Sequence, residues 1–274
     1  MKKTKYIDGG IMLSFDSMSD LLDNVKEMPS GNHSQKESAS RTEFTGGTWK
    51  QAVDQAELGN APQTIEFESA LSNIRTKASD LCKSNEIKFD VTGQSFDVGR
   101  VLTGEPECWI NRDMYEPKEV VKIFVNTSFS FSVSKHIIRN RGAAITALID
   151  LLSEQYIVEP VFIRTVEYNG RKDTTVLTIP NSPLDIDSVC FIASNPMYLR
   201  RLMFASLELG HKQSKCGSYG LPADFTEYES SEDTIYFGSN RHESFHESDF
   251  ESIDSAARYV ARIVEERSKR NGDV

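Results

Sequence analysis

The chain has 274 residues, of which 38% are hydrophobic and 26% charged, and its formal net charge at pH 7 is −10. These proportions are typical of a folded globular protein and exclude a wholly disordered chain. The acidic excess argues against a broad, non-specific coat on nucleic acid. No run of 18 apolar residues could cross a membrane, and the basic start is not followed by the apolar core of a secretory signal. We therefore expect a cytoplasmic protein that does not enter the membrane.

The first 118 residues give short and irregular patterns. A strand is predicted at 12–15 and a helix from about residue 18 to Pro29, which together form an N-terminal strand–helix at 1–28. Residues 29–46 are polar with little to bury, and predict a flexible linker. Helices at 48–56 and 65–81 and strands at 86–91 and 95–98 follow, with 99–106 interpreted as a loop. Residues 47–118 are therefore expected to form an α+β region.

Residues 119–270 alternate more regularly between strand and helix patterns. The apolar run 120–125 predicts a buried strand, and residues 135–156 predict a helix with apolar positions every three to four residues. Strands at 158–168, broken at Pro160, and 174–179 flank the hairpin signal Asn169-Gly170. A helical stretch at 187–207, which Pro196 either kinks or divides, precedes a strand at 234–238 and a helix at 249–270. This order predicts an α/β fold, a layered sheet with helices on both faces.

The loop after the first of these strands is rich in serine. It contains Asn126, Ser128 and Ser130, and resembles the start of a von Willebrand factor A domain, where Asp-x-Ser-x-Ser binds a divalent metal. The resemblance covers about residues 118–270 and implies a von Willebrand A-like fold. Asn126 replaces the expected carboxylate, and Mg²⁺ is normally bound through carboxylates. We therefore expect a degenerate motif without metal, or a loop that merely caps the next helix.

Cationic residues gather locally despite the net negative charge. Lys135, Arg139 and Arg141 lie on one predicted helix, and Arg200 and Arg201 lie on another. Single-stranded nucleic acids are commonly bound by cations that contact phosphates and by aromatic rings that stack on bases. The candidate rings are those of Trp109 and Phe129. If these side chains converge they predict a single-stranded-DNA site; otherwise the cations form a solvated face and the rings belong to the core.

A second resemblance concerns the N-terminal part of the chain. Residues 49–52 and 96–108 resemble phage-encoded proteins, a group that includes a single-stranded-DNA-binding protein that recruits the phage RNA polymerase. The resemblance implies single-stranded DNA and an RNA polymerase as partners in phage transcription or replication.

Motifs for catalysis and cofactor binding are weak. Gly104 is followed by Glu105, whose charge would repel phosphate, and His242 and His246 lack a nearby cysteine pair. The four cysteines are widely spaced and predict no disulfide framework. We therefore expect a non-enzymatic, phage-type protein without cofactor that binds single-stranded DNA and/or recruits an RNA polymerase, as the second resemblance implies. The alternatives are a protein–protein adaptor with a metal-free von Willebrand A-like domain and a metal-dependent hydrolase.

Overall fold

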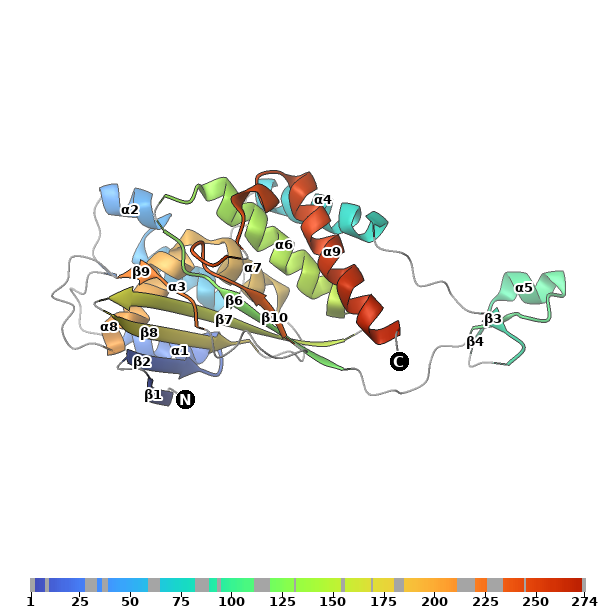
Figure 1. Ribbon diagram of the computed structural model, residues 1–274, viewed down its shortest axis with the longest axis horizontal. Helices are drawn as coiled ribbons and strands as arrows, with labels where there is room; N and C mark the ends of the chain where they lie inside the picture. Colours follow the sequence, from blue (N-terminus) through green and yellow to red (C-terminus); the bar gives the residue numbers. More distant parts are fainter. Residues whose placement is uncertain are drawn as a thin grey trace.

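The structure is a computed structural model. It describes residues 3–7, 10–27, 34–35, 39–58, 65–81, 89–92, 95–110, 119–130, 132–153, 156–168, 170–179, 185–210, 220–225, 234–243 and 245–272. Most of these residues form one main body in which helices lie on a sheet, and residues 89–110 form a small separate unit (Figure 1). Within the described residues, no helix is long and apolar enough to cross a membrane.

The main sheet has the strand order β1-β2-β8-β7-β6-β10, and β9 pairs with β7 beside this path. The strands are β1 (Lys3–Ile7), β2 (Gly10–Phe15), β6 (Val120–Asn126), β7 (Ile157–Tyr168), β8 (Arg171–Thr178), β9 (Leu221–Pro222) and β10 (Thr234–Phe237). β6 runs parallel to both β7 and β10, while β7 and β8 form an antiparallel hairpin. At the other side, β2 runs parallel to β8 and β1 closes the edge in the antiparallel direction.

The hairpin forms where the Asn-Gly signal predicts it. Tyr168 pairs with Arg171, and Gly170 has a φ of 73°, which favours glycine. The expected break at Pro160 is not seen, because β7 continues through this residue. The last pair of the β7–β8 ladder is Val161 with Thr178, so Pro160 lies just outside that ladder and its missing N–H removes no bond from it.

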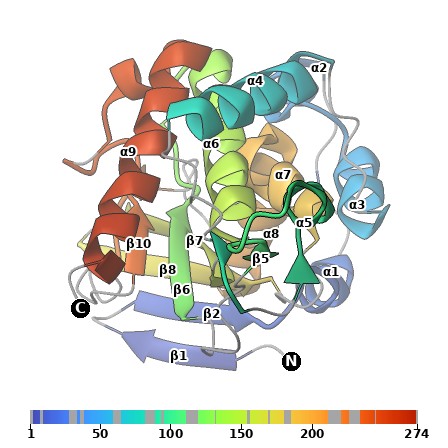
Figure 2. The same ribbon diagram turned by 90° about the vertical axis from the view of Figure 1, so that its right-hand side faces the viewer.

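The helices of the main body include α6 (Lys135–Ser153), which packs against several of the others. The others are α1 (Met18–Lys26), α2 (Ala39–Thr45), α3 (Trp49–Leu58), α4 (Ile65–Leu81), α7 (Ile186–Ser194), the π-helix η1 (Tyr198–Met203), α8 (Phe204–Gly210), the short 3₁₀ helix η3 (Glu247–Asp249) and α9 (Ile253–Gly272). Both α7 and α9 pack beside α6, and α4 lies across α6 and α9 on the side away from the sheet (Figure 2). Because neighbours enclose α6, 13 of its 19 residues are buried.

The expected α/β layered fold is confirmed. Alternate residues of the strands, such as Leu13, Ile123 and Phe162, join the helices in one large core cluster. The opposite sheet face carries a smaller apolar cluster around Phe124 and Ile163 that contains no helical residue. In the described part of the chain, therefore, helices pack against one face of the sheet and not against both.

The expected division into segments needs correction. Residues 3–27 are not a separate strand–helix, because β2 pairs with β8 and extends the main sheet. Helices α3 and α4, expected in an α+β region of their own, pack on the helices of the main body. The expected flexible linker contains helix α2 at 39–45, and Ser34 and Thr45 are buried; residues 29–33 and 36–38 lie outside the described residues.

Residues 89–110 form the separate unit with three short strands, β3 (Phe89–Asp90), β4 (Ser95–Phe96) and β5 (Trp109–Ile110), and helix α5 (Val98–Thr103). The interpretation of 99–106 as a loop is wrong. Asp97 caps the helix start by accepting a hydrogen bond from the Arg100 N–H, and Gly104 ends it in a left-handed conformation with φ 75°. Both capping residues were present in the sequence, but a six-residue helix is too short to give a clear periodic pattern.

Candidate binding site at the carboxyl edge of the sheet

The candidate site lies where β6 and β10 end side by side. Because these strands are parallel and adjacent, the loops that follow them leave the same edge of the sheet. The segment after β9 reaches the same place, since the Ala223 N–H donates to the Thr165 carbonyl of β7. We call residues 126–130, 223–225 and 236–242 the carboxyl edge.

Asp224 is the centre of the hydrogen bonds at the carboxyl edge. Its Oδ1 accepts from Asn126 Nδ2 at 3.0 Å, from the Tyr236 hydroxyl at 3.0 Å and from the Ser239 N–H at 2.6 Å. Its Oδ2 accepts from the Ser239 hydroxyl at 2.8 Å. Burial raises the pKa of Tyr236, and the charge of Asp224 acts in the same direction, so the phenol remains a donor. One carboxylate thus joins three segments of chain.

Asn126 presents its amide nitrogen, and not its oxygen, to Asp224. Nδ2 also donates to the Ala223 carbonyl at 2.8 Å, while Oδ1 accepts from the Ser128 N–H at 2.9 Å. Both contacts fix the orientation of the amide, because a flipped amide would bring oxygen to oxygen and N–H to N–H. The residues therefore do not fit a divalent cation here: the N–H group points at the only carboxylate of the cluster.

The serines of the expected metal motif also have structural partners. The Ser128 hydroxyl donates to the Thr165 carbonyl at 2.8 Å and accepts from the Thr165 N–H at 3.0 Å, which ties the loop to β7. The Ser130 N–H donates to Asn240 Oδ1 at 2.9 Å, which ties the same loop to the one after β10. The three motif residues thus all form hydrogen bonds within the carboxyl edge or to β7.

Behind the carboxyl edge lies Arg141, a buried charge. Its side chain on α6 is 1% exposed, and Nη2 donates to the Gly238 carbonyl at 2.9 Å. Its Cζ lies 5.0 Å from the Phe129 ring centre, 5.6 Å from that of Phe237 and 5.8 Å from that of Phe245. Burial lowers the pKa of Arg141 to about 10, so it is still charged at neutral pH.

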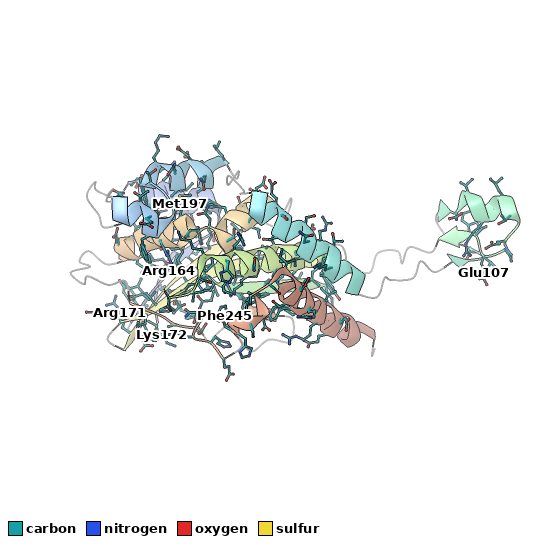
Figure 3. The ribbon with its side chains drawn as sticks, turned by 90° about the horizontal axis from the view of Figure 1, so that it is seen from above. Glu107, Arg164, Arg171, Lys172, Met197 and Phe245 are labelled. Carbon is teal, nitrogen blue, oxygen red and sulfur yellow. The ribbon has the colours of Figure 1, made fainter. Side chains whose placement is uncertain are left out.

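The expected single-stranded-DNA patch does not form as one surface. Arg200 and Arg201 are buried at 7% and 0% exposure, and Arg141 is buried as well. The guanidinium groups of Arg200 and Arg201 donate to carbonyls of this chain where phosphates were expected. That of Arg141 donates to the Gly238 carbonyl. Trp109 lies in the separate unit; in Figure 3, Glu107 of that unit lies well away from the main body, which carries Phe245. Phe129, Lys135 and Arg139 remain on one continuous stretch of loop and helix.

Arg200 and Arg201 hold an N-terminal segment, residues 34–35 and 39–47, that we call the strap. Arg201 donates to the Gly47 carbonyl through Nε and Nη2, at 3.1 and 2.9 Å, and to the Ser34 carbonyl through Nη1 at 2.8 Å. Arg200 donates to the Phe44 carbonyl at 2.6 Å and lies 4.2 Å from the Phe44 ring centre. These contacts explain why the strap is ordered where a linker was expected.

Sequence reasoning missed four residues of the carboxyl edge: Asp224, Tyr236, Ser239 and Asn240. No motif marks Asp224 in the sequence, whereas Ser239 and Asn240 follow a predicted strand and could have been compared with the loop at 126–130. His242 and His246 do not share a helix; His242 lies in a turn, and His246 precedes η3. Among the described residues, no cluster of three or more His, Cys, Asp or Glu could hold a metal ion.

Comparison with known proteins gives one match. The family model described as "Domain of unknown function (DUF7192)" matches residues 7–268, and the chain therefore belongs to this family. No curated protein matches the chain, and no solved structure does.

Proposed function

We propose that the chain is a non-enzymatic binding protein, a protein–protein adaptor of the cytoplasm, and that the carboxyl edge is its binding surface. The observation that carries this proposal is the set of four hydrogen bonds that Asp224 accepts from Asn126, Tyr236 and Ser239. A nucleophile or general base must be able to reach a substrate. Here the hydroxyl and carboxylate groups bind one another and make a rigid support for the loops that follow β6 and β10.

The strand order supports a von Willebrand A-like layout for this part of the chain. The first strand of the expected domain, β6, lies between β7 and β10, and the hairpin partner β8 lies outside β7. We propose that this layout is kept without its metal. A metal-dependent hydrolase is disfavoured by the donor set, because the amide N–H of Asn126 and not an oxygen faces Asp224.

Site-specific cross-linking tests the adaptor proposal. Benzoylphenylalanine is placed at position 135 or 241, which are exposed and beside the carboxyl edge, and at position 50 on α3 as the control. Illumination in cells should give a protein adduct from positions 135 and 241 and not from position 50. RNA polymerase is the first candidate to identify in the adduct, because the phage resemblance implies it. Equal adducts from all three positions, or none, would contradict the proposal.

Single-stranded-DNA binding is a second candidate, which one observation favours. Phe129, Lys135 and Arg139 lie on one continuous loop and helix start, and Lys135 is exposed. Cations beside a ring suit a single-stranded backbone and its bases. Fluorescence anisotropy with a labelled oligonucleotide at low and high salt tests this candidate. Binding should weaken in the variant Lys135→Ala/Arg139→Ala and remain in the control Lys50→Ala; no binding at low salt would reject it.

A further inference from the structure

The guanidinium of Arg141 is a buried charge with an open donor. Nη1 is buried and has no hydrogen-bond partner, and among the described residues Arg141 forms no ion pair. Arg201, which is equally buried, donates from all three of its nitrogens to carbonyls. A buried charge without a partner is costly, and buried charges in proteins are normally paired. Arg141 therefore lacks a hydrogen-bond acceptor for Nη1, whereas each guanidinium nitrogen of Arg201 has one.

The Asp224 carboxylate is not the missing acceptor for Arg141 Nη1. Burial lowers the pKa of Arg141, and Tyr259, Tyr236 and then Asp224 act in the opposite direction. The Asp224 oxygens, however, accept from Asn126, Tyr236 and Ser239. The guanidinium also lies near the rings of Phe129, Phe237 and Phe245 and donates to the carbonyl of Gly238. Ring faces attract a cation weakly and cannot accept a strong hydrogen bond.

We propose that Arg141 is the anchor of a carboxylate-binding site at the carboxyl edge, and that its ligand is an acidic side chain of a protein partner. This inference rests on the adaptor function proposed above. A carboxylate carries one charge and matches a single guanidinium with one open nitrogen. A phosphate dianion would bring a second charge next to three benzene rings and a carbonyl.

The cover of the site is formed by two rings. Phe129 and Phe245 are half-buried and meet edge to face with their centres 6.0 Å apart (Figure 3 labels Phe245). They come from the loops after β6 and β10, which the Ser130–Asn240 hydrogen bond also joins, so a ligand that reaches Nη1 must separate the two rings. Lys135 and Arg241 are exposed on the elements that follow, and they attract an acidic group to this edge.

Thermal unfolding of the full chain in sodium acetate and in sodium chloride of equal ionic strength tests the site. Acetate at tenfold excess over its Kd should raise the Tm of the wild type by about 2–5 °C. It should do the same for Lys50→Ala, which is remote from the edge, and should not raise the Tm of Arg141→Met. Phosphate should have less effect than acetate. An equal effect of acetate on the wild type and on Arg141→Met would overturn the proposal.

The same variant separates a binding role from a structural one. If Arg141 only holds the loops, Arg141→Met should lower the Tm in chloride; if its charge is kept for a ligand, methionine should leave the Tm unchanged or raise it. Should Arg141→Met fail to fold, NMR of the wild-type arginine side chains decides: acetate must shift the Arg141 Nη–H signals, and no shift refutes the site. If acetate binds but positions 135 and 241 give no specific cross-links, the adaptor function is refuted and the carboxylate site is not. If Arg141→Met leaves the cross-links intact, the carboxylate site is refuted and the adaptor function is not.

Discussion

Replacing Asn126 by aspartate exchanges one amide NH2 group for a carboxylate oxygen at the centre of the carboxyl edge. In the wild type, Nδ2 of Asn126 donates to Asp224 Oδ1 at 3.0 Å and to the Ala223 carbonyl at 2.8 Å. In Asn126→Asp, an oxygen takes the place of this donor and faces two acceptors. The variant therefore loses two hydrogen bonds and gains a repulsion between two carboxylates.

The cost follows from the 3.0 Å separation. Two unit charges at this distance repel by about 5 kcal/mol at an effective dielectric constant of about 20. Protonation of one carboxyl limits the cost, since holding a carboxyl with a reference pKa of about 3.9 protonated at pH 7 requires about 4 kcal/mol. We expect Asn126→Asp to lower the free energy of unfolding by about 4 kcal/mol at pH 7 and the Tm by roughly 10 °C.

The loss should depend on pH with a defined sign. In Asn126→Asp, the carboxyl pair binds a proton more tightly in the folded than in the unfolded state. Folding therefore raises the pKa of the pair. The penalty is therefore smallest below about pH 4 and grows with rising pH by about 1.4 kcal/mol per unit until the folded pair loses its proton. Urea unfolding of wild type and Asn126→Asp at pH 4.5, 6 and 7.5 measures this dependence.

Two further measurements complete the test. Mg²⁺ or Mn²⁺ at millimolar concentration should raise the Tm of Asn126→Asp and not that of the wild type, because a cation between two carboxylates removes their repulsion. In the control Asn126→Asp/Asp224→Asn only one carboxylate remains, so the added pH dependence should disappear. An Asn126→Asp protein as stable as the wild type at pH 7.5 without metal would show that the two side chains do not meet as described.

Three other substitutions or modifications have expected outcomes. Arg201→Met leaves the strap carbonyls of Ser34 and Gly47 without their donors, and should lower the free energy of unfolding by about 2–4 kcal/mol in urea and speed proteolysis of the strap; no change in either would show that Arg201 does not hold the strap. Gly142→Ala brings a Cβ to 2.5 Å from Ser194 Cβ. The clash should cost about 1–3 kcal/mol, more than the gain of about 1 kcal/mol in helix propensity, so the Tm should fall. An unchanged Tm would contradict the close contact between α6 and α7. Burial raises the pKa of Cys190 to about 12, so iodoacetamide at pH 8 should modify half-buried Cys108 and spare Cys190 until the protein unfolds, as peptide mass mapping will show.

Short-range sequence patterns determined the helices and strands of this protein. The apolar run at β6, the spacing of apolar residues in α4, α6 and α9 and the Asn-Gly turn of the hairpin each lie within a short window of chain. Propensity and periodicity act over the same short range, and the sequence therefore predicts them well. The order of these elements also indicated the α/β class, and the loop at 126–130 was correctly predicted to follow a buried strand.

Tertiary structure alone decided how these elements combine and what the charges do. The pairing of β2 with β8 joins residues about 160 positions apart, and Asp224 meets Asn126 across 98 positions, distances over which no local pattern extends. The arginines at 141, 200 and 201 look like surface cations in the sequence. Only packing shows that two of them bind the strap and that the third lies behind the carboxyl edge, because the partners that make a buried charge tolerable are carbonyls and rings from distant segments.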